Sequence, residues 1–404
     1  FLKKKKKMKK KKIYKALGLM SGTSMDGVDA SIVSSIDGER DLSRIKNQYF
    51  DYDKVLYQKL TNLRDKISTS KDLNKYSAEL KMVEREITLF HAKVADIIIK
   101  KDTDWEPDLI GFHGQTIFHD SNQKLSVQLG DGNLLSQLTK KTVIYNFRQN
   151  DLKNGGQGAP LTPIFHQTIK SQMKNSQWPL LFLNIGGISN VTSTSKSPKI
   201  LGNNILESAY NVFAGDIAPG NCLIDEWIRK NSKHKYDKEG LIAKSGKVNE
   251  LILNQALDNF TGKTYDSFQL FSLDIKDFDI AFVRGLSLED GAATLTHLTA
   301  GLISEGLIKF MLKNYPNEKN LLTSTTILIC GGGRKNKFLI EVLKKNLHVK
   351  EIELIDEYGF DGDFIESQAF GYLAIRSYLG LPISFPSTTG CEKPTTGGVI
   401  IKNY

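Results

Sequence analysis

The expected order of strands and helices occurs twice along this chain, and that repetition limits the fold more than any other feature. Each unit is expected to open with strands joined by short turns and to continue as alternating helices and strands. The strands of the first unit are expected at Lys15–Met20, Ala30–Ser34, Gln48–Tyr52, Leu109–His113 and Thr142–Phe147. Those of the second unit are expected at Leu181–Ile185, Ser189–Thr194, Thr326–Cys330 and Glu351–Ile355. This pattern predicts two similar α/β lobes that face a cleft.

The spacing of apolar residues places helices between and after these strands. One long helix is indicated by apolar residues that recur every three or four positions. These residues are Leu80, Val83, Ile87, Phe90, Val94 and Ile97. Further helices are expected near Leu134–Lys140, Pro163–Met173, Ala292–Asn314, Lys337–Asn346 and Glu366–Leu379. Because short turns join the opening strands, we expect mixed rather than purely parallel sheets.

The boundary between the two lobes is expected near Ser176–Pro179. The N-terminal lobe would cover residues 13–178. The C-terminal lobe would cover residues 179–404, with a helical insert and a final segment able to pack back on the first lobe. Residues 1–12 are rich in lysine, and we expect them to form a disordered tail.

The charge of the chain is concentrated in that tail. The formal net charge is +10, but nine lysines lie within Phe1–Lys12, which leaves 46 basic against 45 acidic residues elsewhere. A nearly neutral body gives no reason to expect a nucleic-acid partner. Neither an apolar run of about 18 residues nor a secretory signal is recognisable, so no membrane association is expected. Three scattered cysteines predict neither a disulfide framework nor a zinc site, which suggests a reducing, cytoplasmic setting.

A glycine- and hydroxyl-rich turn at Gly18–Asp29 lies between two expected strands of a hairpin. Gly22 and Gly27 would allow the backbone to come close to a ligand. Hydroxyl groups that can donate hydrogen bonds to phosphate belong to Ser21, Thr23 and Ser24. Asp26 and Asp29 place carboxylates beside these donors, where Mg²⁺ could lie between protein and phosphate. The alternative interpretation is a polar hairpin turn without a ligand.

Two further glycine clusters follow expected strands. Asn184–Asn190 contains Gly186 and Gly187. It follows the first strand of the second unit, just as the Gly18–Asp29 turn follows the first strand of the first unit. Two such loops facing each other could hold a polyphosphate through backbone N–H groups and hydroxyls. Gly331–Gly333 ends another strand and opens a helix, whose N-terminus favours an anion. Each cluster could also be a tight turn, and neither matches the P-loop or the dinucleotide-binding motif.

A carboxylate suited to general-base chemistry lies in the segment Asn146–Leu161, at the expected end of a strand. Asp151 is flanked by Arg148 and by the glycine-rich run Gly155–Gly158. An ionised carboxylate can remove a proton from water or a hydroxyl, and a nearby arginine would help to keep it ionised. An aspartate that forms an ion pair with Arg148 and shapes the turn explains the same spacing equally well.

Other polar residues follow strand ends or precede helices. His113 and Gln115 could hydrogen-bond a sugar or orient a water molecule, although a lone histidine of this kind is more often structural. Asp216 begins the segment Asp216–Asn221, interpreted as a polar loop that opens a helix. Asp216 is a candidate for contact with nucleotide or with the hydration shell of a metal, and helix capping is the alternative.

Together these motifs resemble the anhydro-N-acetylmuramic acid kinase family, a branch of the actin, hexokinase and Hsp70 superfamily of ATPases. The matching segments are Gly18–Asp29, Gly111–Thr116, Gln128–Gly132, Phe147 and Arg148 with Asp151, Gly155–Leu161, Asn184–Asn190, Gly331–Gly333, and Glu366 with Ala369 and Phe370. The resemblance extends from about Ile13 to the C-terminus. It implies an actin-like ATPase fold, in which two ribonuclease H-like lobes surround a central cleft.

The resemblance also implies a reaction in bacterial cell-wall (peptidoglycan) recycling. Such kinases convert 1,6-anhydro-N-acetylmuramic acid, ATP and water to N-acetylmuramic acid 6-phosphate and ADP. Asp151 would be the catalytic base that activates water for attack on the anomeric carbon. The oxygen O6 would leave that carbon and receive the γ-phosphoryl group. A homodimer is also suggested by the family.

The family implies the following binding residues. ATP would contact Gly22, Thr23, Ser24, Met25, Asp26, Gly27, Val28, Asp29, Asn184, Gly186, Gly187, Asp216, Gly331, Gly332 and Gly333. Mg²⁺ would lie near Asp26, partly through water. The sugar would contact His113, Gln115, Arg148, Gly156, Gln157 and Glu366.

Two segments depart from the family pattern. One is Phe260–Phe268, where the family has a Lys-Ser-Thr-Gly-Arg-Glu-like segment, and the other is Asp216–Asn221. Where the family has Asp-Thr-Gly-Pro-Gly-Asn, this chain has Ile217 and Ala218 at the second and third positions of Asp216–Asn221. The change removes a hydroxyl and adds a methyl group where backbone could approach phosphate. Two alternatives therefore stay open: a kinase of a related sugar, and a nucleotide-binding sensor with weakened catalysis.

Overall fold

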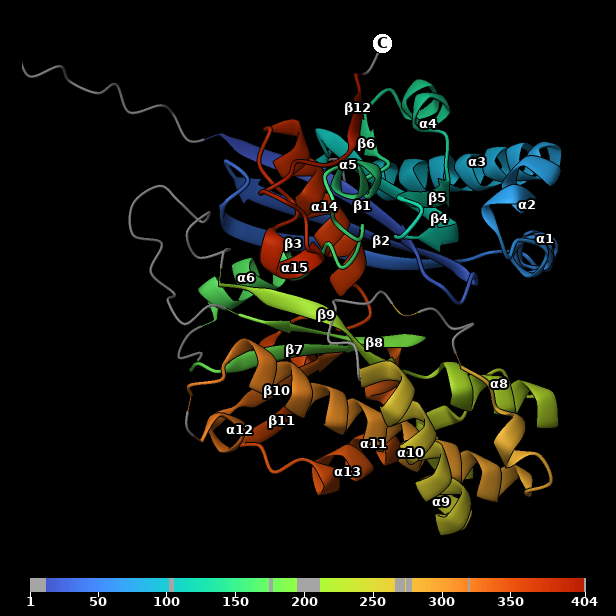
Figure 1. Ribbon diagram of the computed structural model, residues 1–404. Helices are drawn as coiled ribbons and strands as arrows, with labels where there is room; N and C mark the ends of the chain where they lie inside the picture. The colour runs from blue at the N-terminus through green and yellow to red at the C-terminus, as the bar shows by residue number, and fades with distance from the viewer. Residues whose placement is uncertain are drawn as a thin grey trace, which may run out of the picture.

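A computed structural model describes residues 12–101, 105–173, 177–194, 211–265, 273, 278–318 and 320–402 (Figure 1). Most of the lysine-rich tail lies outside the described residues, and so do residues 174–176 at the expected boundary between the lobes. Within the described ranges, the strands form two separate sheets.

The first sheet has the strand order β12-β6-β4-β1-β2-β3, with β5 paired to β4. Its strands are β1 (Ile13–Ser21), β2 (Gly27–Ile36), β3 (Arg40–Asp51), β4 (Leu109–Asp120), β5 (Leu125–Leu129), β6 (Thr142–Tyr145) and β12 (Val399–Ile401). The strands β1, β2 and β3 form an antiparallel meander, whereas β4 lies parallel to β1 and to β6. The sheet is therefore mixed, as the short turns between its opening strands predict.

The second sheet repeats this arrangement with the order β11-β10-β7-β8-β9. Its strands are β7 (Leu180–Ile185), β8 (Ile188–Ser193), β9 (Phe213–Pro219), β10 (Thr326–Cys330) and β11 (Glu351–Leu354). Again three strands form an antiparallel meander, and the two later strands lie parallel to the first. The prediction of an α/β chain with two ribonuclease H-like lobes is confirmed by this shared strand order.

Helices cover both faces of each sheet and also lie between the two sheets (Figure 1). They are α1 (Lys54–Lys66), α2 (Ser70–Lys75), α3 (Ser77–Lys101), α4 (Gly132–Thr139), α5 (Gln149–Lys153), α6 (Pro163–Gln172), α8 (Cys222–Asn231), α9 (Leu241–Ser245), α10 (Glu250–Tyr265), α11 (Leu288–Asn314), α12 (Leu321–Ser324), α13 (Lys337–Asn346), α14 (Ile365–Tyr378) and α15 (Pro386–Thr389). Short 3₁₀ helices occur at η2 (Lys238–Gly240), η4 (Ala281–Val283), η5 (Gly332–Lys335) and η6 (Ile355–Tyr358).

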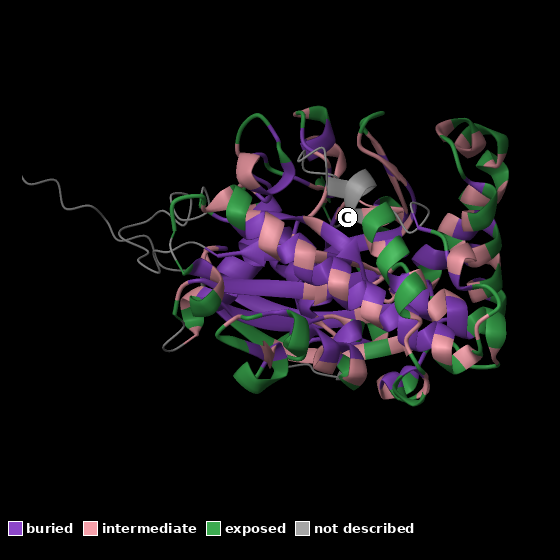
Figure 2. Cartoon of the chain, turned by 60° about the horizontal axis from the view of Figure 1, so that its bottom comes forward, coloured by how far each residue is buried: buried purple, intermediate pink, exposed green. Residues whose placement is uncertain are grey.

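The apolar core has three parts. One lies between the first sheet and helices α1 and α3, and a second lies between the second sheet and helices that include α8 and α11. The third joins side chains of both sheets to the helices α6 and α14, which lie between them. In Figure 2 the strands are buried along most of their length, whereas the outer helices alternate between buried and exposed residues. This alternation is the pattern of helices that bury one face.

The two middle helices lie on the sheet of the opposite half of the chain. Helix α6 comes from the first half, yet its His166 ring stacks on Phe182 of β7, with centroids 4.7 Å apart, and bonds to Thr192 of β8 at 2.9 Å. Helix α14 comes from the second half and packs on β1, β2 and β4. In addition, β12 pairs with β6 in the first sheet. The two halves of the sequence therefore interlock.

The close packing of α14 depends on glycine in the strand beneath it. A Cβ atom on Gly18 of β1 would lie 1.9 Å from the carbonyl oxygen of Ser367 and 2.5 Å from the nitrogen of Gly371. Such distances are far shorter than van der Waals contact, so only glycine lets helix and strand approach this closely. The glycine at the start of the first motif is thus a packing residue.

The structure corrects one expected element and extends another. Asp216–Asn221 was expected to be a loop, but Asp216–Pro219 forms the end of strand β9. The strand expected at Gln48–Tyr52 is the second half of β3, which begins at Arg40. Among the described residues, no helix is long and apolar enough to cross a membrane.

Candidate active site

The first polar turn joins β1 to β2 and presents three polar side chains to solvent. Its conformation is set by Met25, which is buried and has a φ of +58°, and whose N–H bonds to the carbonyl of Gly22 at 3.2 Å. Thr23, Ser24 and Asp26 are exposed, and the Ser24 hydroxyl donates to the Asp26 carboxylate. The turn therefore offers hydroxyls and a carboxylate to a ligand while its backbone is fixed from below.

The Ser21 side chain is buried beneath this turn and hydrogen-bonded to the protein. This corrects the expectation that its hydroxyl donates to phosphate. The side chain is 1% exposed, and its Oγ lies 2.7 Å from the Tyr52 hydroxyl and 3.3 Å from Nε2 of His91. Since Nδ1 of His91 donates to the Ile87 carbonyl at 2.8 Å, its Nε2 accepts from Ser21. Burial lowers the pKa of His91 to about 4, so the ring is neutral. The result is a buried chain of hydrogen bonds under the turn.

Gln115 also supports the turn. This side chain on β4 is fully buried, and its Nε2 donates to the Gly22 carbonyl at 3.0 Å. Its Oε1 is buried without a hydrogen-bond partner among the described residues. An unpaired buried acceptor is costly, so this oxygen is a candidate to accept a hydrogen bond from a ligand or a water molecule.

His113, on the same strand, lies behind Arg148. Nη2 of Arg148 donates to Nε2 of His113 at 3.0 Å, and Nδ1 of His113 donates to the Gly114 carbonyl at 2.8 Å. Burial, followed by the charge of Arg148, lowers the pKa of His113 well below its usual value. Both ring nitrogens are therefore used in this conformation, and the neutral ring orients Arg148.

Asp151 lies in α5, directly after the strand β6 and its following turn. Its carboxylate is 1% exposed and accepts two hydrogen bonds, from the Gly158 N–H at 2.7 Å and from the Thr389 hydroxyl at 2.7 Å. A Cβ on Gly156 would lie 2.1 Å from Oδ2 of Asp151, so glycine is needed there. Two donors thus fix the plane of the carboxylate while each oxygen keeps a second lone pair.

Arg148 connects this carboxylate to groups from the other half of the chain. Besides His113, it donates from Nη1 to the Gly158 carbonyl at 2.8 Å. Its guanidinium interacts electrostatically with Glu366, Asp216 and Asp151, in that order of strength. Glu366 lies in the first turn of α14, and Asp216 lies on β9. The positive charge of Arg148 therefore interacts with carboxylates from three elements, α14, β9 and α5.

Glu366 and Asp216 both have raised pKa values, because partial burial removes water from around their carboxylates. For Glu366, Arg148 and a hydrogen bond from Asn184 Nδ2 at 3.3 Å partly oppose the effect of burial. For Asp216, burial raises the pKa to about 7, against a hydrogen bond from the Leu273 N–H and the charge of Arg148. These groups can therefore change protonation when a charged ligand arrives.

The second glycine loop packs against Asp216–Asn221, where this chain departs from the family pattern. The carbonyls of Gly186 and Gly187 accept hydrogen bonds from the N–H groups of Asn221 and Gly220, at 2.7 and 2.8 Å. A Cβ on Gly220 would lie 2.2 Å from the Gly186 oxygen. Ile217 and Ala218 are buried in the apolar core, at 4% and 1% exposure. Their methyl groups therefore fill the core beneath the loop.

The third glycine cluster directly follows β10, and Gly332 and Gly333 begin η5. Gly331 has a φ of +79°, and a Cβ there would lie 2.2 Å from Oδ1 of Asn184. Gly333 is packed against Ile185 in the same way, whereas a Cβ on Gly332 would meet no heavy atom within 4 Å. The turn thus has a packed side toward β7 and an open side at Gly332.

Asp29, on β2, completes a concentration of carboxylates. Burial raises its pKa to about 7, and the negative charges of other carboxylates add to this effect. In decreasing order these are Glu366, Asp363, Asp26 and Asp361. Charges from both halves of the chain therefore act on one aspartate.

Sequence comparisons decide the family. The sequence model described as anhydro-N-acetylmuramic acid kinase matches residues 14–403. The chain belongs to the anhydro-N-acetylmuramic acid kinase family. The predicted family is thus confirmed.

Two curated relatives show how close this match is. A protein named anhydro-N-acetylmuramic acid kinase from Pelagibacter ubique (strain HTCC1062) is 51% identical over 394 residues, which cover 97% of this chain and 100% of that protein. One of the same name from Brucella canis (strain ATCC 23365 / NCTC 10854 / RM-666) is 36% identical over 398 residues, or 96% and 99% of the two chains.

A solved structure gives a more distant likeness. It is a ROK family glucokinase from Streptomyces griseus in complex with glucose and AMPPNP. The TM-score is 0.36 at 10% identity, over 89% of this chain and 99% of that chain. This likeness is too distant to carry over any detail of the site.

Within this member of the anhydro-N-acetylmuramic acid kinase family, His113 and Glu366 interact with Arg148, whereas Gln115, also expected to bind sugar, bonds to Gly22. Gly156 touches the Asp151 carboxylate, and Gln157 follows it with its N–H bonded to the Thr389 carbonyl at 2.9 Å. Thr389 was not recognised from the sequence, because it lies 238 positions from the aspartate that it contacts. Its position at the end of the short helix α15, in a sequence rich in threonine and glycine, carries no chemical signal.

Proposed function

We propose that this chain is an ATP-dependent kinase that opens 1,6-anhydro-N-acetylmuramic acid with water and phosphorylates its O6. The products would be N-acetylmuramic acid 6-phosphate and ADP, and the reaction would serve peptidoglycan recycling. The single observation that supports this most strongly is the buried Asp151 carboxylate, held by Gly158 and Thr389 beside Arg148. A relative with the corresponding name is 51% identical over nearly the full chain.

Asp151 would act as the general base. A water molecule bound to the free lone pair of one carboxylate oxygen would lose a proton to Asp151 as its oxygen attacks the anomeric carbon. The bond between that carbon and O6 would break, and the electron pair would remain on O6. No acid is needed to protonate O6, because O6 forms a bond to the γ-phosphorus instead. The bond from that phosphorus to the β,γ-bridging oxygen then breaks and ADP leaves, after which Asp151 returns its proton to solvent.

Arg148 and Glu366 would position the sugar. Arg148 is fixed by His113 and Gly158, and Glu366 is fixed by Asn184. An anionic acetylmuramic sugar presents hydroxyls and a carboxylate, which an arginine and a partly buried glutamate can bind in a defined orientation. We infer that Gln157 and Gly156 contact the same ligand, since they directly adjoin Asp151.

ATP would lie between the three glycine turns. The exposed Thr23 and Ser24 would donate to its phosphates, and the open side of Gly332 leaves room for a nucleotide. Asn184, Gly186, Gly187 and Asp216 would contribute from the second half of the chain. Phosphoryl transfer depends mostly on positioning and charge neutralisation, which such turns provide.

The carboxylates of Asp26 and Asp29 fit Mg²⁺, since oxygen ligands and a concentration of negative charge suit this cation. Within the described residues, no three or more side chains of the metal-binding types form a cluster. Mg²⁺ would therefore be held partly through water and the phosphates of ATP. Bound there, it would neutralise phosphate charge.

We also infer a cytoplasmic setting, because the relatives' substrate is a cell-wall fragment used together with ATP. The cysteines Cys222, Cys330 and Cys391 are free and buried, which suits a reducing compartment. A homodimer is proposed from the family resemblance, and light scattering of the purified chain tests it.

The test is turnover of the sugar by Asp151→Asn. This substitution keeps the shape of the side chain but removes the base, so we expect kcat to fall on the order of 100- to 10,000-fold. ADP release is measured with ATP, Mg²⁺ and the anhydro-sugar. Asp225→Asn is the matched control, because Asp225 is a partly buried aspartate whose charged neighbours are Arg229 and Asp237 rather than Arg148.

Two results would contradict the proposal. The unsubstituted chain could fail to phosphorylate the anhydro-sugar while phosphorylating a related sugar or none at all. Alternatively, Asp151→Asn could retain the turnover of Asp225→Asn. Binding of ATP without turnover on any sugar would favour a nucleotide sensor instead.

A further inference from the structure

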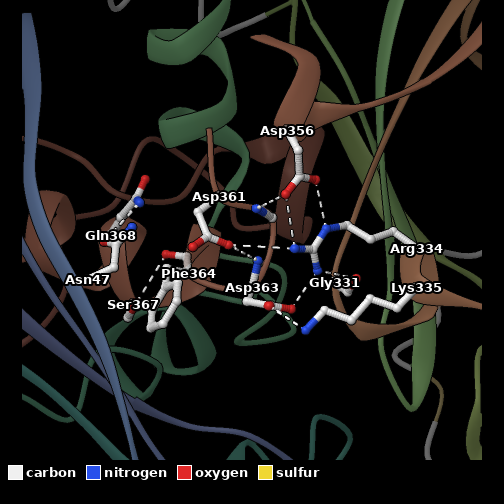
Figure 3. Close-up of polar contacts among 11 residues, drawn as sticks. Asn47, Gly331, Arg334, Lys335, Asp356, Asp361, Asp363, Phe364, Ser367 and Gln368 are labelled. Carbon is white, nitrogen blue, oxygen red and sulfur yellow. Dashed lines mark hydrogen bonds and ion pairs between the residues drawn. The ribbon is translucent and has the colours of Figure 1, made fainter. Parts of the chain in front are cut away.

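The glycine turn after β10 is tied to the start of α14 by one buried arginine (Figure 3). Arg334 follows directly after Gly333 and is 7% exposed. It binds Asp356 through two hydrogen bonds, from Nε at 2.8 Å and from Nη2 at 3.1 Å. It also forms ion pairs with Asp363 and, at 3.5 Å, with Asp361. We call Arg334 and these three aspartates the Arg334 cluster.

Backbone contacts make the turn and the cluster one unit. Nη1 of Arg334 donates to the Gly331 carbonyl at 3.2 Å, and the Gly331 N–H donates to the Gly362 carbonyl at 3.1 Å. Gly362 lies flat against the guanidinium, since a Cβ there would be 2.4 Å from Nε of Arg334. The segment before α14 therefore cannot shift without moving the glycine turn.

Glu366 lies at the other end of this unit. The Asp363 carboxylate, three residues before it, is held by Arg334 and by Lys335. Asn184, which donates to Glu366, is the residue against which Gly331 packs. Both routes from the glycine turn, through the Arg334 cluster and through Asn184, thus lead to the same glutamate.

The start of α14 is also fixed to the first sheet. The Ser367 hydroxyl lies 2.6 Å from the Ser31 hydroxyl of β2, and Nε2 of Gln368 donates to Oδ1 of Asn47 at 3.1 Å. Figure 3 shows Ser367 and Gln368 on the side of α14 that faces Asn47. Glu366 therefore lies between two fixed points. On one side Ser367 and Gln368 bind the first sheet, and on the other side is the Arg334 cluster next to the second sheet.

The bidentate geometry matters more here than the charge. The side chains of Asp356, Asp361 and Asp363 are 37%, 44% and 31% exposed, so water screens them and their ion pairs contribute modestly to stability. A planar guanidinium, however, fixes the direction of each partner, which an ammonium group cannot do. The cluster is therefore suited to set a geometry rather than to hold the fold together.

We propose that Arg334 is a positioning residue that couples nucleotide at Gly331–Gly333 to the placement of Glu366. The inference rests on the proposed function, in which that turn contacts ATP and Glu366 contacts the sugar. Nucleotide that orders the turn would also order the start of α14, so the sugar would bind to a glutamate already in place. By linkage, the sugar would strengthen nucleotide binding by the same factor.

The test is a binding cycle measured by calorimetry. The dissociation constant of the anhydro-sugar is determined with and without a non-hydrolysable ATP analogue and Mg²⁺. For the unsubstituted chain we expect the analogue to tighten sugar binding by about 5- to 150-fold, the usual range of such coupling. Arg334→Lys keeps the positive charge but loses the planar guanidinium and its two-point contact with Asp356. In this variant the factor by which the analogue tightens sugar binding should fall toward one. A merely structural defect would weaken both binding constants and leave their ratio unchanged.

Two further variants make the result decisive. Asp356→Asn removes one charged partner and leaves Arg334 in place, so it tests the cluster even if Arg334→Lys fails to fold. Lys337→Met is the matched control, because it removes a basic residue three positions away whose ion pair is with Glu239. We expect Asp356→Asn to reduce the coupling factor and Lys337→Met to retain it.

Hydrogen exchange separates this inference from the proposed substrate. The ATP analogue alone should slow exchange at the backbone of residues 364–368 in the unsubstituted chain, and should do so far less in Arg334→Lys. If the sugar does not bind at all but this protection is seen, the substrate is wrong and the coupling stands. An unchanged coupling factor or unchanged protection in both Arg334→Lys and Asp356→Asn would overturn the inference.

Discussion

At the scale of one residue, the raised pKa of Asp29 makes the stability of the folded chain depend on pH. Its pKa of about 7, raised from 3.8, means that the folded chain holds this proton more tightly than the unfolded chain does. Ionised Asp29 therefore costs stability, and the cost grows as pH rises through the interval between these two values. Below about pH 4 the group is protonated in both states and the cost disappears.

Asp29→Asn should remove this dependence. We expect the variant to melt at a higher temperature than the unsubstituted chain at about pH 8, with a smaller difference at about pH 5. The measurement is thermal unfolding of both proteins across this range without ligand. A difference in melting temperature that is the same at every pH would show that ionisation of Asp29 is not its cause.

Residue types in the motifs could be predicted from the sequence, but not the direction of each side chain. Ser21 has the composition of a phosphate ligand, yet it ends a strand with its hydroxyl directed to Tyr52 and His91. His113 has the chemistry of a sugar ligand, yet both its nitrogens are used around Arg148. Such outcomes depend on partners brought from distant positions, which spacing within one motif does not encode.

At the scale of the element, Gly332 and Gly333 at the start of η5 form a matched pair for substitution. Gly333→Ala would place Cβ 2.3 Å from Cγ2 of Ile185. We expect it to lower the free energy of unfolding by about 1–3 kcal/mol, the usual cost of overpacking. Gly332→Ala meets no neighbour within 4 Å, so stability should change by less than about 0.5 kcal/mol.

The same pair tests where ATP binds. The methyl group of Gly332→Ala would enter the space proposed for nucleotide, so the KM for ATP should rise although the fold is unaffected. Denaturant unfolding and ATP titration of the two variants give both quantities. A Gly332→Ala protein with normal stability and normal KM for ATP would remove this turn from the nucleotide site.

Most elements could be predicted because their apolar spacing is regular, and the failures have a physical cause. Strand β9 ends in Asp216–Pro219, where a charged residue and a proline favour a loop by local preference. Pairing with β8 and burial of Ile217 and Ala218 override that preference. Arg334 directly follows the Gly331–Gly333 motif, but its partners lie more than 20 positions away in the sequence and give no local signal.

At the scale of the whole molecule, the two halves exchange helices across a shared core. Helix α6 lies on the second sheet, α14 lies on the first, and both contribute to the apolar cluster between them. This exchange brings Glu366 of the second half to Arg148 of the first. Neither half alone contains the proposed base, the sugar ligands and the phosphate-binding turns, so the activity requires the complete chain.

The central claim is that Asp151 directs water to the anomeric carbon while O6 receives phosphate. It is tested most directly by running the reaction in water enriched in a heavy oxygen isotope and analysing the product at once by mass spectrometry. We predict a sugar phosphorylated on O6 with one heavy oxygen on the anomeric carbon, formed at least about 100-fold more slowly by Asp151→Asn. Heavy oxygen in free phosphate, with no labelled sugar, would contradict the account.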